Sequence, residues 1–102
     1  MFEKVNLVKK ANIYFDGKVT SRTIFYPCGT RKTLGIMLPG EYEFGTDAPE
    51  LMEIQAGTVE ILLPNETEWR TVTAGGSFEV PGKSKFQIKM NEVVDYICSY
   101  LN

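Results

Sequence analysis

Arg31 and Glu50 have the residue types and surroundings that suit chemistry on an anionic or polar substrate. Arg31 follows Gly29 and Thr30. A guanidinium offers a forked pair of N–H donors to an oxyanion, and the preceding glycine-containing stretch can leave backbone N–H groups free. Glu50 alternates with Met52, so a carboxylate lies on an otherwise apolar face. A carboxylate on an inward face is costly unless it is hydrogen-bonded or neutralised, which makes Glu50 a functional candidate.

Both residues also have a simpler interpretation, which the sequence leaves open. Arg31 can be a solvated charge at a strand end or one partner of a surface ion pair. Glu50 can be a rim residue that is exposed to water just after the turn at residues 46–49.

Composition excludes the usual metal and nucleic-acid functions. The sequence contains no histidine, and Cys28 and Cys98 are isolated thiols without C-x-x-C spacing. We therefore expect no metal and no cofactor, and two reduced, partly buried cysteines. A net charge of −2 and a pI near 5.1 argue against binding the polyanionic backbone of nucleic acids.

Length and hydropathy predict one small intracellular domain. The chain has 102 residues, and 43% apolar composition suffices for one core. Its longest apolar runs, such as residues 61–63, are far shorter than the roughly 20 residues of a membrane-spanning helix. The first ten residues do not resemble a signal peptide. We therefore expect no membrane partner and a cytoplasmic location.

The elements that must position these residues are short alternating runs separated by turn signals, which is the pattern of an antiparallel sandwich or barrel. We expect an all-β fold, a jelly-roll barrel whose strands close on each other to hide their edges. Residues 1–13 are expected to be weakly structured or an edge segment, and residues 14–102 to form the barrel. The predicted strands are 19–25, 31–38, 41–46, 50–55, 58–63, 69–72, 77–80, 84–90 and 93–101.

Alternation along these strands predicts which side chains meet inside the barrel. One face of 41–46 carries Tyr42, Phe44 and Thr46, and one face of 84–90 begins with Ser84 and Phe86. On the last strand the corresponding residues are Tyr96, Cys98 and Tyr100.

The spacing of several of these residues resembles the two motifs of metal-binding cupins, G-x5-H-x-H-x3/4-E-x6-G and G-x5-P-x-G-x2-H. Glu50 and Gly57 keep the E-x6-G spacing, and Gly75 and Pro81 keep the G-x5-P spacing. The metal-ligand positions of that pattern fall on Phe44, Thr46, Glu50 and Phe86, with Lys85 as the alternative to Phe86. Only the acid remains among the ligands.

A narrower resemblance covers residues 14–101. The chain resembles the small cupin family of broad-specificity pyrimidine/purine nucleoside phosphorylases in the runs at 14–19, 40–44, 49–50, 62–64, 67–69, 80–82 and 96–98. The resemblance implies a metal-free homodimer, a glycosyltransferase of the pentosyltransferase type, which uses phosphate to split many nucleosides into free base and ribose 1-phosphate.

That reaction requires donors for phosphate, a carboxylate for the ribose and flat walls for the base. Arg31 is the candidate for phosphate, with Ser84 and Lys18 as secondary candidates. Glu50 is the candidate for the ribose and for the cationic ring of the transition state. The base is expected to lie among aromatic side chains, with Met52 as an adaptable filler and Thr46 as a hydrogen-bonding candidate. Those aromatic candidates are Tyr42, Phe44, Phe86 and Tyr96.

Two other functions remain open at this point. The chain can be a non-catalytic, metal-free cupin that binds a small metabolite as a homodimer, because fold alone does not fix function. It can also be a purely structural dimerisation module, in which Arg31 and Glu50 would share no pocket.

Overall fold

The computed structural model describes residues 1–101, and these residues form eleven β-strands and one short 3-10 helix. The all-β prediction is confirmed. No helix within the described residues is long and apolar enough to cross a membrane. The elements are β1 (Asn6–Leu7), β2 (Asn12–Tyr14), η1 (Phe15–Gly17), β3 (Val19–Phe25), β4 (Arg31–Met37), β5 (Gly40–Thr46), β6 (Glu50–Ala56), β7 (Thr58–Leu62), β8 (Arg70–Thr73), β9 (Ser77–Val80), β10 (Ser84–Met90) and β11 (Val94–Tyr100).

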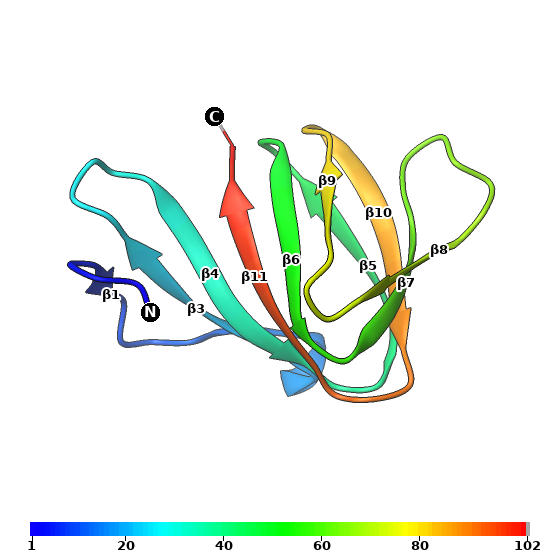
Figure 1. Cartoon of the computed structure of the whole chain (residues 1–102), viewed down its shortest axis with the longest axis horizontal. Coiled ribbons are helices and arrows are strands. Elements are labelled where there is room, and N and C mark those ends of the chain that lie inside the picture. Colours follow the sequence, from blue (N-terminus) through cyan, green and yellow to red (C-terminus); the bar gives the residue numbers. More distant parts are fainter. Residues whose placement is uncertain (102) are drawn as a thin grey trace.

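The strands form two antiparallel sheets that face each other (Figure 1). The larger sheet has the order β1-β3-β4-β11-β6-β9, with β2 also paired to β3. The smaller sheet has the order β5-β10-β7-β8. Consecutive strands pair at β2–β3 and β3–β4, whereas β11 lies between β4 and β6, which are far from it in sequence.

Closure of the barrel was predicted and is wrong, because no ladder joins the two sheets among the described residues. Three of the four sheet edges are short strands instead. The edge strands β8 and β9 have only four residues each, and β1 has two, so they offer little unpaired backbone to another chain. The fourth edge, β5, has seven residues and leaves a longer free edge.

Alternating side chains fill the space between the sheets. Phe86 of β10 lies directly opposite Phe44 of β5, and Cys98 of β11 lies opposite Met52 of β6. The largest fully buried side chains are Met37, Ile54, Ile61, Ile88, Val19, Val59, Val80 and Val94. The faces that alternation predicted to be inward are therefore the faces that form the core.

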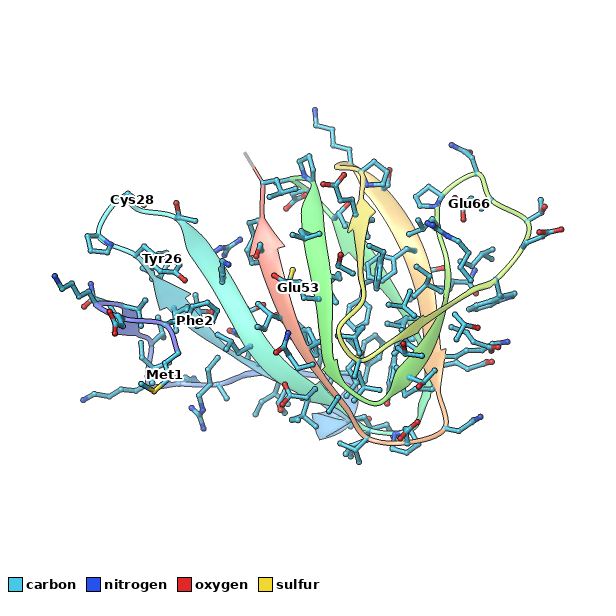
Figure 2. The ribbon with its side chains drawn as sticks, viewed as in Figure 1. Met1, Phe2, Tyr26, Cys28, Glu53 and Glu66 are labelled. Carbon is cyan, nitrogen blue, oxygen red and sulfur yellow. The ribbon has the colours of Figure 1, made fainter. Side chains whose placement is uncertain are left out.

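The N-terminal segment pairs with the edge of the larger sheet. β1 and β2 both hydrogen-bond to β3. Phe2 packs edge-on against Tyr26, with their ring centroids 6.0 Å apart. Figure 2 shows these two rings together at one end of the molecule, beside the turn that carries Cys28. This turn leads directly into β4. The predicted boundary between an N-terminal segment at 1–13 and the barrel at 14–102 stays a prediction.

Candidate active site

A cavity of about 140 Å³ lies between the sheets and brings together five of the predicted site residues. Glu50 and Met52 come from β6, and Phe44, Phe86 and Tyr96 come from β5, β10 and β11. The remaining wall is formed by Tyr14, Ser21, Thr33, Met37, Gly45, Cys98 and Tyr100.

Glu50 is the acidic residue of this cavity wall. It begins β6 and lies directly opposite Tyr100 of β11. Its Oε1 accepts a hydrogen bond from Cys98 Sγ at 3.3 Å. Burial raises the pKa of the Glu50 carboxyl above its ordinary value, while the Cys98 hydrogen bond and the nearby Arg31 charge act in the opposite direction. Glu50 is thus a half-buried carboxylate inside the site, and the simpler interpretation of a fully exposed rim residue does not describe it.

Arg31 lies at the cavity mouth and does not line its wall. It begins β4, at the same end of the larger sheet as the start of β6 and the end of β11 (Figure 1). Its guanidinium carbon lies 3.9 Å from the centre of the Tyr100 ring. The Arg31 side chain is exposed, so its N–H groups are open to a ligand that enters from solvent.

The turn before Arg31 differs from expectation in one respect. We expected free backbone N–H groups at Gly29 and Thr30, but the Gly29 amide donates to the Tyr26 carbonyl at 2.9 Å. Tyr26 in turn donates its amide to the Thr30 carbonyl at 2.9 Å. Gly29 adopts a φ of +90°, which a residue with a side chain rarely adopts. The turn is therefore a closed structure that fixes the start of β4, and the Gly29 amide is not available to phosphate.

Aromatic rings form one wall of the cavity. The Phe44 and Phe86 rings are stacked, with centroids 5.7 Å apart and an interplanar angle of 29°. Phe86 also packs edge-on against Phe78, with ring centroids 6.0 Å apart. Phe15 packs edge-on against Phe44, with ring centroids 5.4 Å apart. Tyr96 lies on the facing sheet, and burial raises the pKa of its hydroxyl well above the ordinary value. Flat apolar surfaces of this kind suit a planar heterocycle.

Three other predicted residues lie outside the cavity wall. Tyr42 is buried near the start of β5, where its hydroxyl donates to the Leu38 carbonyl at 2.7 Å. The Thr46 hydroxyl donates to the Pro81 carbonyl at 2.7 Å. The Ser84 hydroxyl donates to the Gly82 carbonyl at 3.1 Å. These polar groups all have partners within the protein, and their roles in substrate binding stay predictions.

Lys18, a secondary phosphate candidate, lies far from Arg31. Lys18 precedes β3, whose first residue Val19 pairs with Met37 at the end of β4, whereas Arg31 begins β4. Six residues of extended strand separate the two ends by about 20 Å. Lys18 and Arg31 therefore cannot hold the same phosphate.

Sequence reasoning missed several residues of the cavity wall, although part of the signal was present. Cys98 and Tyr100 share the predicted inward face of β11 with Tyr96, and Thr33 and Met37 alternate along β4 in the same way. Tyr14 and Ser21 had no such signal. Tyr14 lies on β2, which was not predicted as a strand. Ser21 lies on the predicted strand 19–25, but alternation alone does not show that a polar residue there lines a site.

The residues at the cupin metal positions do not fit a metal ion. Phe44 and Phe86 offer no ligand atom, and the Thr46 hydroxyl is bound within the turn. Lys85, the alternative to Phe86, points to the outside, where its Nζ lies 3.9 Å from Glu43. Within residues 1–101, no group of three histidine, cysteine, aspartate or glutamate side chains is arranged to hold a metal.

Comparison with solved structures places the fold among known proteins. A protein of unknown function from Acinetobacter sp. ADP1 superimposes with a TM-score of 0.96 at 42% identity, covering 99% of this chain and 98% of that one. The polyketide cyclase RemF from Streptomyces resistomycificus superimposes with a TM-score of 0.70 at 13% identity, covering 91% of this chain and 74% of that one. This second likeness concerns the fold alone and confirms the cupin-type jelly roll.

Comparison of sequences identifies the family. The family model for pyrimidine/purine nucleoside phosphorylase matches residues 9–100. A protein of Wolinella succinogenes named pyrimidine/purine nucleoside phosphorylase is 62% identical over 100 residues, which is 98% of this chain and 95% of that protein. Because the match covers nearly the whole of both chains, this chain belongs to the pyrimidine/purine nucleoside phosphorylase family.

Proposed function

We propose that this protein cleaves purine and pyrimidine nucleosides with inorganic phosphate, giving the free base and ribose 1-phosphate. A phosphate oxygen forms a bond to the anomeric carbon while the glycosidic C–N bond breaks. The proton of hydrogenphosphate is transferred in net terms to the base nitrogen that leaves. The reaction is therefore a pentosyl transfer that balances without an oxidant, a reductant or a cofactor.

The observation that carries this proposal is the convergence of Arg31 and Glu50 on one residue. Arg31 stacks on the face of Tyr100, and Glu50 lies directly opposite Tyr100 on the neighbouring strand. A cation at the mouth can hold phosphate, and a carboxylate inside can accept from ribose hydroxyls. The same carboxylate stabilises the positive charge that develops on the ribose ring as the base leaves.

The aromatic wall supports a broad choice of bases. The stacked rings of Phe44 and Phe86 contact a base through its face, which purines and pyrimidines share. The phenylalanine rings carry no hydrogen-bonding atoms, so this wall itself does not select between bases by hydrogen bonds. Family membership supports the same conclusion, because the relatives' names include both classes of nucleoside.

The test is phosphate-dependent release of base from uridine and inosine by the purified protein. We expect uracil or hypoxanthine to appear together with an equal amount of ribose 1-phosphate, the latter followed by ³¹P NMR. Omission of phosphate should abolish release, and the Glu50→Gln variant should be strongly impaired. Nucleoside binding without any turnover would contradict the proposal and favour a metabolite-binding protein instead.

A homodimer and a cytoplasmic location complete the proposal. Several large apolar side chains are exposed on the N-terminal segment and β4, among them Leu7, Ile13 and Ile36, and pairing of two copies would cover apolar surface of this kind. Cys28 and Cys98 are free thiols, which are kept reduced in the cytoplasm.

A further inference from the structure

The central strand β11 contacts both candidate catalytic residues. It lies between β4, which begins with Arg31, and β6, which begins with Glu50. Cys98 and Tyr100 are two residues apart on β11, so their side chains point to the same face, and both line the cavity. Cys98 contacts Glu50 and Tyr100 contacts Arg31.

The Cys98–Glu50 contact has a defined donor. Burial, and after it the neighbouring Glu50 carboxylate, raises the pKa of the Cys98 thiol to about 12, so the sulfur keeps its proton at neutral pH. The thiol therefore donates to Glu50 Oε1 at 3.3 Å. Cys98 is 4% exposed and is held within the sheet, so it fixes the side chain of a carboxylate that would otherwise be free to rotate. This contact occupies one carboxylate oxygen and leaves the other for a substrate.

The Arg31–Tyr100 contact restrains the cation in a different way. A guanidinium stacked on a ring uses its flat face, while its N–H donors point outward in the guanidinium plane. The distance of 3.9 Å between Arg31 Cζ and the ring centre is typical of close stacking. Arg31 is exposed and has no carboxylate within ion-pairing distance among the described residues, so the Tyr100 ring is the contact that orients it.

We propose that Cys98 and Tyr100 are positioning residues for phosphorolysis, Cys98 by holding the Glu50 carboxylate for the ribose and Tyr100 by holding the Arg31 guanidinium for phosphate. This inference rests on the proposed function. It assigns the inward face of one strand to the alignment of two groups that come from two other strands. Neither residue needs to touch the reacting atoms.

The Tyr100 contact is tested by comparing two substitutions. Tyr100→Phe keeps the ring and should leave the KM for phosphate within about twofold of the wild type, whereas Tyr100→Leu removes the ring face and should raise it about tenfold. The KM for nucleoside should change little in either variant. An equal rise in the phosphate KM for both substitutions, or no rise in Tyr100→Leu, would overturn the role of the ring.

The Cys98 contact is tested through the pH dependence of kcat/KM. The charged or titratable groups around Glu50 are Arg31 from β4, Asp47 from the turn before β6, and Cys98 and Tyr100 from β11. Removal of the thiol in Cys98→Ala takes away a donor to the ionised form, which moves the acidic limb of the profile to higher pH. We expect about a fivefold loss of kcat/KM at the acidic end and a smaller loss at alkaline pH.

Two further variants serve as controls for Cys98→Ala. Cys98→Ser keeps a donor at the same position and should restore the acidic limb. Cys28→Ala removes the exposed thiol outside the cavity and should leave the whole profile unchanged. An acidic limb that is the same in wild type and Cys98→Ala would overturn the role of the thiol.

Measurements without turnover separate this inference from the proposed function. Calorimetric titration with inorganic phosphate should give weaker binding in Tyr100→Leu than in Tyr100→Phe. An NMR titration of the Glu50 carboxyl should show a higher pKa in Cys98→Ala than in Cys98→Ser. A wild type without phosphorolysis would refute the proposed function alone, whereas unchanged phosphate affinity and an unchanged Glu50 pKa would refute the positioning roles.

Discussion

Thr46 and Ser84 face each other across the β5–β10 pair and are joined by a hydrogen bond in which the Ser84 amide donates to Thr46 Oγ1 at 3.1 Å. The same hydroxyl donates to the Pro81 carbonyl at 2.7 Å. Thr46 therefore connects the end of β5 to the turn that precedes β10, its neighbour in the sheet. The hydroxyl is 35 residues away in sequence from the carbonyl that it binds.

We expect Thr46→Val to lower the free energy of unfolding by about 1–3 kcal/mol, because the shape is kept but the Ser84 amide and the Pro81 carbonyl lose a partner. Urea denaturation measures this change. At a temperature where the variant is folded, kcat/KM should stay within about threefold of the wild type. A loss of order 10² in a folded variant would instead place Thr46 among the substrate contacts.

Removal of the Arg31 guanidinium should weaken the use of phosphate. We expect Arg31→Ala to raise the phosphate KM and lower the rate by about 10² to 10³, as for removal of one preorganised electrostatic partner. Arg31→Lys should recover only part of the loss, because an ammonium lacks the fork and the flat stacking face. Nucleoside affinity, measured by calorimetry, should change little. The control is Arg70→Ala, since Arg70 pairs with Glu66 at 3.5 Å outside the cavity.

Neutralisation of Glu50 should impair nucleoside binding or turnover. Glu50→Gln keeps the shape but loses charge-assisted acceptance from ribose hydroxyls and the support of a cationic transition state, so we expect a rate loss of about 10² to 10³. The matched control is Glu53→Gln, because Glu53 is three residues along the same strand and points to the opposite face. Steady-state kinetics with uridine and inosine decide the outcome, and equal rates in both variants would place the site elsewhere.

The same substitution has a predicted effect on stability. The pKa of Glu50 is raised above its ordinary 4.5, mainly by burial. Between 4.5 and the raised value the folded protein binds more protons at this residue than the unfolded chain, so its contribution to stability falls as pH rises through that window. Glu50→Gln removes this loss. The Tm of the variant relative to wild type should therefore increase with pH. For a chain of this size, each kcal/mol of difference in unfolding free energy corresponds to about 4–8 °C in Tm.

A scan of Tm against pH by calorimetry tests this sign. Glu53→Gln provides the reference for loss of one surface charge. A Glu50→Gln variant that becomes relatively less stable with rising pH would mean that the ionised carboxylate stabilises the fold, and would contradict the burial-dominated shift.

Chelation should leave the reaction unaffected. Aromatic rings occupy two of the cupin metal positions, so the donor set for a transition metal is incomplete. We expect full phosphorolysis after exhaustive dialysis against a chelator, with metal content followed by elemental analysis. Stoichiometric zinc, iron or manganese whose removal abolishes activity would contradict this.

The assembly is expected to be a homodimer. Light scattering at micromolar concentration should give twice the chain mass of 11.5 kDa. Replacing Ile36 by Lys, which puts a charge on the exposed side of β4, should shift the mass toward that of a single chain if this face is the contact. A monomeric wild type would refute the dimer, and an unaffected mass in Ile36→Lys would place the contact on another surface.

Most strands were predictable because alternation and turn residues both mark them. The bounds of 19–25, 77–80 and 84–90 agree with β3, β9 and β10 at both ends. The other predicted strands differ from the structure by one residue at one end or, for β8 and β11, at both ends. β1, β2 and η1 were missed because they are short and largely exposed. Their pairing depends on the edge of β3, and no local pattern encodes a contact of that kind.

The candidate site was predictable to the extent that one strand face defines it. Glu50, Met52, Phe44 and Phe86 follow from alternation and lie together in the cavity. The involvement of Tyr100 with Arg31 did not follow, because it requires β11 to lie between β4 and β6, and strand order in a sheet is a long-range property. A sequence does not show which hydroxyls the fold itself uses, and the hydrogen bonds of Thr46 and Ser84 within the protein were not predictable. The roles of these two residues as substrate contacts stay predictions.

The stacked pair Phe44–Phe86 has a consequence for any redesign of this site as a metal centre. Besides Glu50, the cupin-type ligand positions are Phe44, Thr46 and Phe86, and one imidazole beside Glu50 does not complete a ligand set. Replacing either phenylalanine alone by histidine would lose ring packing in the core without gaining metal affinity. The two rings therefore make every single step from this core toward a metal site costly in stability.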